Sequence, residues 1–405
     1  MGHTGIFEPM PLSTQWYEGV AGLRQLRADW YELTPDAQLF ARFEWHLAAA
    51  THLVGDDHRI WFCRIGDDEG RPLSIIPAVT AIASIKFLGH LPTLTLGWDT
   101  QLAALDFPLA HSADPCEVGK AMLKAFSHLQ SDWRVISWPR VMANSNAARV
   151  AMALNHWLTD ITPASLCSTF YTGSIPSPAD GFEVFTVKSS KLRRTLAQHS
   201  RRLCQQGRIQ MRMAREEGDI EGFFKEFLRI ESSGWKGEKG TRTAIALVPA
   251  AQAFYSSLLA QSNANFETDI ALLYCGDKAV AGQFLIRTAH WEYVYKIGYD
   301  EAFAKCSPGQ ILLQLEVERA KASGGIERVS LVTGRDWMKK WEPIQEPTLE
   351  INIFQHMWRP FIVHVGRFFL TRIRGARRNS VLVRTLKNVL TGRKQSMRDA
   401  GQLAG

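Results

Sequence analysis

The pattern of apolar and polar positions is clearest in the second part of the chain. Ile209, Met211 and Met213 alternate with polar residues, as in a half-buried strand. Longer segments then repeat apolar residues every three or four positions, which is typical of amphipathic helices. The pattern predicts a strand, two helices, three antiparallel strands, a helix and two final strands separated by a short helical turn, at 208–214, 219–233, 249–261, 269–276, 279–288, 290–300, 308–325, 326–334 and 348–354.

A basic helix is predicted before these elements. It covers 189–207, with Ser190 as its N-cap and Gly207 at its C-terminal end. The first part of the chain repeats the later order loosely, which predicts an internal duplication. Its predicted elements are two helices, three strands, a helix and a strand, at 14–30, 38–53, 59–66, 72–79, 93–98, 116–130 and 133–138.

Length and composition set the class of protein. With 405 residues and 46% hydrophobic residues, the chain is long enough for two globular domains. No run has the roughly 20 apolar residues of a membrane-spanning helix, and the N-terminus lacks the pattern of a secretory signal. The six cysteines show no paired or metal-ligand spacing. We therefore expect a soluble cytoplasmic protein with reduced thiols and no metal site.

Positive charge is concentrated at the C-terminal end. Residues 358–405 contain eleven Lys or Arg and one acid, a balance of +10, so the rest of the chain is near −3 in a total of +7. Apolar residues at helical spacing between the arginines predict an amphipathic helix. Residues 358–398 could bind an anionic membrane surface, which would place the protein at the inner face of the membrane. They could also bind nucleic acid or an acidic partner, or pack on the body of the protein.

Several short motifs in this order resemble a known family. They are GWKG at 234–237, FY at 254–255, AVAGQF at 279–284, YKIGYDEAFAKCSPGQILL at 295–313 and a Lys-Trp pair closing 334–341. Together they resemble the bacterial acetyltransferase family associated with cellulose and exopolysaccharide biosynthesis, a FemAB-like branch of the GNAT superfamily. The resemblance spans about residues 15–356 and is strongest over 185–345.

The resemblance implies an α/β (α+β) fold with two tandem GNAT-like domains. Each would have a mixed, largely antiparallel sheet flanked by helices. The domains would be a degenerate one at 1–180 and an acyltransferase at 181–356, followed by a basic helical tail at 357–405. The implied activity is acyl transfer from acetyl-CoA or another acyl-CoA to an amine or hydroxyl, with a sugar of envelope or exopolysaccharide biosynthesis as one acceptor class.

The predicted helix after residue 307 is the candidate donor site. A helix N-terminus presents unsatisfied N–H groups and partial positive charge, so it can bind a pyrophosphate. Ser307 fits as N-cap, Gln310 would complete a capping box, and Gly309 would let a ligand approach the backbone. The resemblance adds Ala281 and Gly282 of AVAGQF to this site. The usual GNAT phosphate loop, Gln or Arg followed by Gly-x-Gly or Gly-x-Ala, is absent, which leaves the donor open.

In a GNAT-like core, the strand before this helix would face the reaction. Acyl transfer needs a base for the acceptor and an acid for the leaving thiolate, and Asp300 and Tyr299 fit these roles. Tyr295 and Lys296 are further candidates on this strand. Simple alternation would put Lys296 and Gly298 on the face opposite Tyr295. Each tyrosine could equally be a packed core residue.

A glycine-rich loop, 231–245, would border the acceptor pocket. Trp235 offers a flat apolar wall, Lys236 could bind a carboxylate or phosphate, and Glu231 could act as base. Trp337 belongs to the closing motif and is a further substrate-binding candidate. The corresponding loop of the first domain, 99–115, has no Gly-rich helix start, so we expect it to be structural or to wall the acceptor groove.

Two other functions remain open. A FemAB-type transferase would use aminoacyl-tRNA, with the basic helix 188–202 and the tail contacting phosphates. A non-catalytic partner in a polysaccharide system would use the tail as a docking arm. The sequence does not identify the acceptor, the acyl chain length or the oligomeric state.

Overall fold

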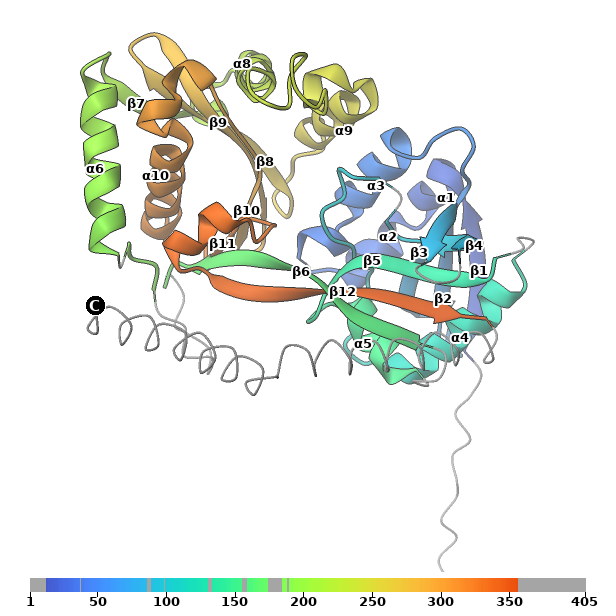
Figure 1. Cartoon of the computed structure of the whole chain (residues 1–405). Helices are drawn as coiled ribbons and strands as arrows, with labels where there is room; N and C mark the ends of the chain where they lie inside the picture. The colour runs from blue at the N-terminus through green and yellow to red at the C-terminus, as the bar shows by residue number, and fades with distance from the viewer. Residues whose placement is uncertain are drawn as a thin grey trace, which may run out of the picture.

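One mixed sheet of twelve strands connects two lobes (Figure 1). The computed structural model describes residues 12–36, 38–85, 89–97, 99–129, 133–154, 159–173, 184–187 and 189–355. The order across the sheet is β1-β2-β3-β4-β5-β12-β6-β11-β10-β9-β8-β7. Neighbouring strands are antiparallel except for the β4–β5 and β10–β11 pairs. The predicted α/β fold class, with a mixed sheet flanked by helices, is therefore confirmed.

The first half runs from β1 to β6. Its elements are β1 (Ser13–Glu18), α1 (Gly19–Gln25), α2 (Arg27–Leu33), η1 (Leu39–Ala41), α3 (Phe43–His52), β2 (Ile60–Gly66), β3 (Pro72–Ile85), β4 (Gly89–Thr95), α4 (Pro115–Ser127), β5 (Val135–Met142), α5 (Asn146–Ala153) and β6 (Thr159–Tyr171).

The second half repeats this order after one additional helix, α6. Its elements are α6 (Ser190–Cys204), β7 (Ile209–Met213), α7 (Ala214–Glu217), α8 (Ile220–Ser232), η2 (Ile245–Leu247), α9 (Pro249–Ala260), β8 (Glu267–Cys275), β9 (Lys278–Thr288), β10 (Trp291–Tyr299), η3 (Glu301–Cys306), α10 (Pro308–Ala322), β11 (Arg328–Ser330), η4 (Asp336–Trp341) and β12 (Ile344–Phe354). In both halves a strand and helices precede three antiparallel strands, and a helix then leads to a strand parallel to the third of them. The internal duplication predicted from the sequence is present in this order.

The two halves exchange their last strands. β6 ends the first half but pairs with β11 of the second half, at Phe170 opposite Val329. β12 ends the second half but pairs with β5 of the first half, at Ile353 opposite Ile136. β6 and β12 also pair with each other, so the sheet is continuous from one lobe to the other. The domain limits at residues 180 and 356 stay predictions.

Helices cover both faces of the second half (Figure 1). α6 and α10 lie on one face over an apolar cluster that includes Leu196, Leu285 and Val317. α8 and α9 lie on the other face, where the core is continuous with that of the first half. α3 packs against α9, and the Trp45 ring lies 5.1 Å from the Tyr295 ring. Large apolar side chains thus hold the halves together.

Some sequence predictions need correction. The helix expected at 14–30 begins with β1, because Ser13–Glu18 pairs with β2, and helix α1 starts only at Gly19. The N-cap of α6 is Ser189, whose hydroxyl accepts the Leu192 N–H, so the prediction of Ser190 was wrong by one residue. The predicted tail at 357–405 lies outside the described residues.

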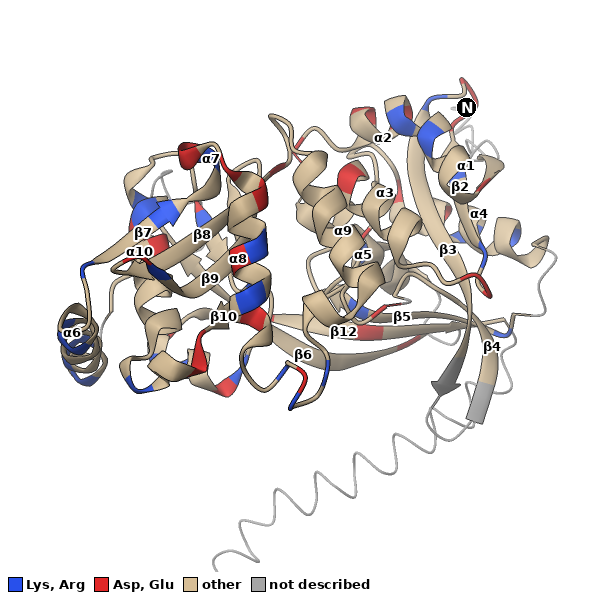
Figure 2. Ribbon diagram, turned by 90° about the horizontal axis from the view of Figure 1, so that it is seen from above, with Lys and Arg blue, Asp and Glu red and all other residues tan. Residues whose placement is uncertain are grey.

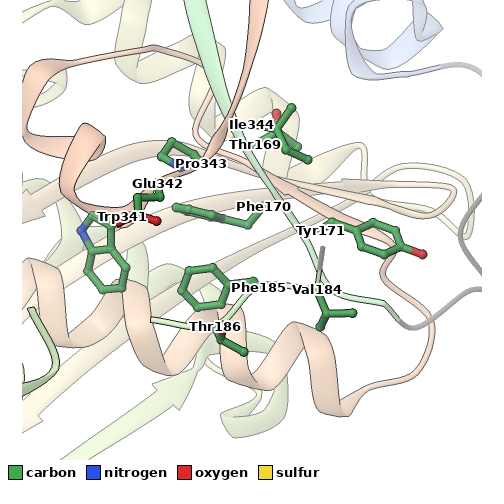
Figure 3. A pocket seen from close by; sticks show the side chains of 10 residues that line it. All are labelled: Thr169, Phe170, Tyr171, Val184, Phe185, Thr186, Trp341, Glu342, Pro343 and Ile344. Carbon is green, nitrogen blue, oxygen red and sulfur yellow. The ribbon is translucent and has the colours of Figure 1, made fainter. Parts of the chain in front are cut away.

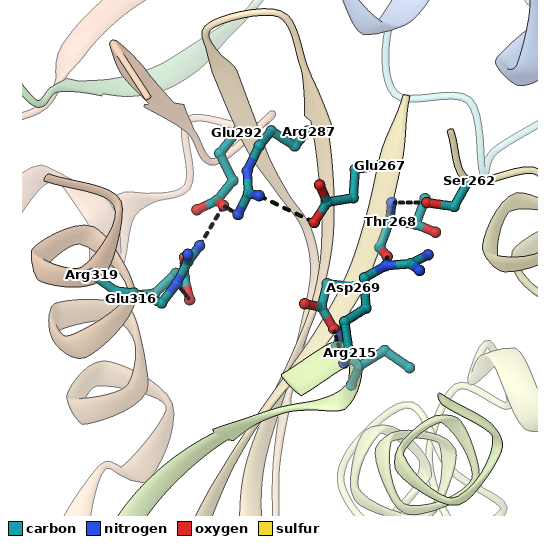
Figure 4. A network of polar contacts seen from close by, with 10 residues as sticks. Arg215, Ser262, Glu267, Thr268, Asp269, Arg287, Glu292, Glu316 and Arg319 are labelled. Carbon is teal, nitrogen blue, oxygen red and sulfur yellow. Dashed lines mark hydrogen bonds and ion pairs between the residues drawn. The ribbon is translucent and has the colours of Figure 1, made fainter. Parts of the chain in front are cut away.

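A buried ionic network ties α10 to the sheet (Figure 4). Glu292 of β10 accepts hydrogen bonds from Arg287 at 2.8 Å and from Arg319 of α10 at 2.5 Å. Arg319 also binds Glu316, and Arg287 also binds Glu267. Burial and the charge of Glu292 raise the pKa of Glu316 well above its usual range. Burial opposes ionisation of Glu292 as well, but a hydrogen bond with Glu316 and the two guanidinium groups keep the pKa of Glu292 below its usual value. The surroundings therefore favour the protonated form of Glu316 and the ionised form of Glu292.

Candidate active site

Strand β10 separates from its parallel neighbour β11 after three residue pairs. The pairing covers Trp291–Tyr293 opposite Arg328–Ser330. From Val294 to Tyr299, no strand in the described part of the chain continues β10 on that side. The separation gives the open sheet edge expected from the resemblance, at the end of β10 that leads into α10.

A β-bulge in β10 determines which side chains face which helix layer. Val294 pairs with Leu285 and Lys296 pairs with Phe284, so Tyr295 is the extra residue. Lys296 therefore lies on the same face as Tyr295, toward α8 and α9. The alternation predicted from the sequence was wrong at this point, because it assumed a regular strand. Ile297 lies on the other face, beside α10.

Tyr295 anchors the first half rather than lining an open site. It is buried, and its hydroxyl donates to the Gln101 carbonyl and accepts the Ala103 N–H at 3.0 Å. Tyr255 of α9 donates to the Gln101 side chain at 3.1 Å. Burial raises the pKa of Tyr295. The first-half loop 99–115 thus contacts β10 and α9 through Gln101 and Ala103, and Tyr295 is poorly placed for proton transfer.

Three charged residues gather on the face of β10 that Lys296 occupies. Glu231, near the C-terminal end of α8, pairs with Lys236 at 2.8 Å and accepts the Ile245 N–H at 2.9 Å. Gly298 allows the backbone of α8 to lie close to β10, since a Cβ at this position would lie 2.9 Å from the Glu231 Cα. Burial, followed by the nearby charge of Lys236, lowers the pKa of Lys296 to about 8. The structure therefore brings these three predicted residues into one region.

Asp300 and Tyr299 have different surroundings although they are adjacent. Asp300 is buried, pairs with Lys278 at 2.9 Å and accepts the Ala302 N–H at the start of η3. Burial alone would raise its pKa, but the contacts with Lys278 lower it. Tyr299 is 37% exposed, and burial and Glu301 raise its pKa, so it stays protonated.

The start of α10 differs from the predicted capping box. Ser307 has a left-handed backbone, φ 47°, and its side chain makes no capping hydrogen bond. Instead, its carbonyl accepts the Gln310 N–H at 2.9 Å, which uses one of the amides expected to be free. The Gln310 side chain accepts the Trp341 indole N–H at 2.9 Å. The amide of Gly309 has no acceptor in the described residues. Gly309 is partly exposed, and a Cβ there would make an ordinary contact with the Tyr299 ring at 3.7 Å.

The AVAGQF strand contributes a residue that the sequence analysis did not select. Ala281 is buried, and a Cβ on Gly282 would lie 2.9 Å from the Phe227 ring, so neither offers an open surface. Gln283 is fully buried, and both polar atoms of its side chain lack a partner within the described structure. It pairs with Ile297, which places it on the α10 face of the sheet. In the sequence, Gln283 could have been selected because it is the only amide side chain in the otherwise apolar stretch 279–286.

An aromatic cavity lies beyond the first turn of α10 (Figure 3). It encloses about 40 Å³, room for a few water molecules, between β6, the segment before α6 and the start of β12. Phe170, Phe185 and Trp341 line it, with the Phe185 and Trp341 rings 6.1 Å apart. Trp341 also binds Gln310, so the cavity and the start of α10 share this side chain.

The two predicted substrate-binding tryptophans lie in different places. Trp235 follows α8 and is 63% exposed, with the Lys236 Nζ 5.8 Å from its ring. It therefore stands beside the charged cluster. Trp337 is 37% exposed in η4, a turn that contacts α10 through Trp341 rather than the loop after α8.

One comparison with known protein families matches the second half of the chain. Residues 190–340 match the family model of an acetyltransferase (GNAT) domain. The match runs from the start of α6 into η4 and includes Glu231, Lys296 and the whole of α10. This part of the chain has a GNAT acyltransferase fold. The narrower polysaccharide-associated branch stays a prediction.

Several solved structures resemble the chain at low sequence identity. FemX has 10% identity and a TM-score of 0.49, covering 82% of this chain and 96% of its own. The C-terminal domain of a putative lysylphosphatidylglycerol synthetase from Agrobacterium fabrum has 12% identity and a TM-score of 0.48, covering 84% and 92%. A tandem GNAT protein from the clavulanic acid pathway has 9% identity and a TM-score of 0.45, covering 85% and 99%. No curated protein matches the sequence.

Two searches of the described residues are negative. No helix among them has the length and apolar character needed to span a bilayer. Among the same residues, no three His, Cys, Asp or Glu side chains are grouped as ligands for a metal ion.

Proposed function

We propose that the protein is an N- or O-acyltransferase that moves an acyl group from acyl-CoA to an amine or hydroxyl. Sugars of envelope or exopolysaccharide biosynthesis are the acceptors to test first. The observation that carries the proposal is the free edge of β10 within a GNAT domain. One face of this edge leads to Gly309 and Gln283, and the other to Lys296 and Glu231.

The α10 side suits the donor. The Gly309 amide lies at a helix N-terminus, which favours a phosphate group. The unpaired Gln283 amide needs a hydrogen-bonding partner, because an unsatisfied buried polar group costs about 1–3 kcal/mol. The pantetheine arm of acyl-CoA carries amides that can meet this need. These two residues, with Ser307 and Gln310 supporting the turn, would hold the donor.

The reaction needs two proton transfers. The acceptor nitrogen or oxygen attacks the thioester carbon and the carbon–sulfur bond breaks. Glu231 takes the proton of the acceptor, and Tyr299, which stays protonated, donates one to the leaving thiolate. Trp235 and Lys236 would border the acceptor. Glu231→Gln and Tyr299→Phe should each lower kcat by about 10²–10⁴.

Donor binding can be tested with a pair of glycine substitutions on one helix. Gly309→Glu places a bulky acid at the start of α10. Gly325→Glu places the same side chain just beyond the other end, where a Cβ meets nothing within 4 Å. Acetyl-CoA should raise the Tm of the wild type and of Gly325→Glu, but not of Gly309→Glu. Equal stabilisation of both variants would contradict the proposed donor site.

A second candidate donor is aminoacyl-tRNA, and helix α6 favours it. Figure 2 shows basic residues along α6. Among them, Lys191, Arg194, Arg201 and Arg202 are exposed, whereas the leucines of this helix are buried. None of the four has an ion-pair partner within the described residues. Such a row can neutralise several phosphates. If tRNA is the donor, replacing all four by Gln should weaken tRNA binding and reduce its salt dependence. Unchanged salt dependence would remove this alternative.

A further inference from the structure

Lys296 brings a positive charge to the contact between the two halves without an anion beside it. Its Nζ lies 5.7 Å from the Tyr255 ring centre and 5.8 Å from that of Tyr295. Among the described residues, this nitrogen has no hydrogen-bond acceptor and no carboxylate within ion-pair distance. The β-bulge at Tyr295 is what directs it to this face.

The acids near Lys296 are engaged elsewhere. Both oxygens of Glu231 are used, one by Lys236 and the other by the Ile245 N–H. Asp99 accepts the Gln101 N–H at 2.6 Å. The hydroxyls of Tyr255 and Tyr295 are bonded to Gln101, away from the lysine. Within the described residues, no carboxylate is therefore paired directly with the Lys296 ammonium.

The surroundings of Lys296 disfavour its charged form. Burial, Lys236 and Arg140 lower its pKa and outweigh Glu231 and Asp99, which raise it. A part-buried cation without a partner is unfavourable, and the lowered pKa of about 8 reflects that burial and the neighbouring Lys236. A ligand that placed one negative charge beside Lys296 would offset both the burial of its ammonium and the repulsion from Lys236.

We propose that the acceptor carries an anionic group, a carboxylate or a phosphate, that pairs with Lys296. This inference rests on the proposed acyl transfer and specifies its acceptor class. The amine or hydroxyl to be acylated would belong to the same molecule and lie toward Glu231 and the free edge of β10. Neutral acceptors would leave Lys296 unpaired and bind more weakly.

Binding of matched acceptor pairs tests this without a donor. Glucosamine is compared with glucosamine 6-phosphate, and glucose with glucuronate, by calorimetry on the full chain. We expect at least one anionic member to bind about tenfold or more tightly than its neutral counterpart, which also tells phosphate from carboxylate. Lys296→Met should abolish this preference, and Lys296→Arg should retain it. Lys225→Met, on the exposed face of α8, is the matched control and should behave as wild type.

The pH dependence gives a second readout. Wild-type anion binding should weaken above about pH 8, as Lys296 loses its proton, whereas Lys296→Arg should hold it. Lys236, Glu231, Asp99, Arg140 and the two tyrosines also face this site, and they are unchanged in that comparison. Lys296→Met should fold normally, since it removes an unpaired charge.

Two results would overturn the inference: equal binding of the charged and neutral members of both pairs, including no binding of either, or an unchanged preference in Lys296→Met. A transfer assay with acetyl-CoA separates this from the proposed function. Anion binding at Lys296 without acetyl transfer would support the inference and would contradict acetyl-CoA as the donor. In an active enzyme, Lys296→Met should raise KM for the anionic acceptor and largely keep kcat.

Discussion

The hydroxyl of Tyr295 donates a hydrogen bond to the backbone carbonyl of Gln101, 194 positions earlier in the chain. The same oxygen accepts the Ala103 N–H. Tyr295→Phe would leave these buried backbone groups unsatisfied, so the free energy of unfolding should fall by about 1–3 kcal/mol. Urea denaturation measures this. Tyr299→Phe, at an exposed position of the same strand, should keep stability and lose activity; the reverse pattern would refute the separate roles given to the two tyrosines.

The close approach of α8 to β10 predicts a strong effect at Gly298. A Cβ there would lie 2.9 Å from the Glu231 Cα and 3.1 Å from its N, both backbone atoms that move only with the helix. Gly298→Ala should therefore lower stability by about 1–3 kcal/mol and reduce activity by displacing Glu231. Gly325→Ala, in open space, is the control. Thermal unfolding and acyl transfer are the measurements, and a wild-type profile for Gly298→Ala would contradict the packing described.

The buried network of Figure 4 predicts unequal effects for two similar substitutions. Glu316→Gln replaces a carboxyl whose raised pKa favours the protonated form in the folded protein, so near pH 7, where the unfolded chain has this group ionised, the substitution should not lower stability. Glu292→Gln removes the charge that faces Arg287 and Arg319 and should cost about 3–5 kcal/mol. Because the pKa of Glu316 is raised, wild-type stability should fall as pH rises above the usual carboxyl range, and Glu316→Gln should lose that dependence. Urea denaturation from pH 6 to 9 tests both points; equal effects of the two substitutions would show that the proton is not on Glu316.

His46 predicts a pH effect on stability with a definite sign. It is buried, its Nε2 binds the carbonyls of Phe40 and Asp106, and burial lowers its pKa from 6.5 to about 4. The unfolded chain takes up a proton at higher pH than the folded one, so stability is lost as pH falls from 6.5 to 4, by roughly 3 kcal/mol. The Asp106 side chain, whose pKa burial raises to about 6, acts in the opposite direction.

Comparison with His46→Gln isolates the histidine. The difference in free energy of unfolding between wild type and His46→Gln should shrink by roughly 3 kcal/mol between pH 7 and pH 4. A difference that stays constant over this range would mean that His46 is protonated in the folded protein.

Local patterns in the sequence were sufficient for the order of elements. The alternation at Ile209–Met213 and the helical spacing over 219–233 correspond to β7 and α8. Residues 14–18 fall within the predicted helix 14–30, because their strand character depends on pairing with β2, a partner distant in sequence. The exchange of β6 and β12 is also a matter of pairing between distant segments, and the order of elements alone does not reveal it.

The candidate site was predicted less well than the fold. Glu231, Lys236 and Lys296 were selected by residue type, and the structure brings them together. Their arrangement depends on the bulge at Tyr295, which periodicity does not reveal. The capping box at Ser307 failed because the backbone there is left-handed, a conformation that a Ser-Pro-Gly sequence does not specify.

The strand exchange also limits how the protein can be divided. A fragment that stops after β6 would contain β6 without its partner β11, and β5 would lack its neighbour β12. A fragment that starts at α6 would retain the residues proposed to hold the donor and the acceptor but would lose Asp99, Arg140, Phe170 and Phe185. In it, β11 would lack its outer neighbour and β12 would lack both of its own. Exposed strand edges of this kind promote aggregation. The half that matches the GNAT domain model is therefore a poor unit for separate expression, because strands of the first half complete its sheet.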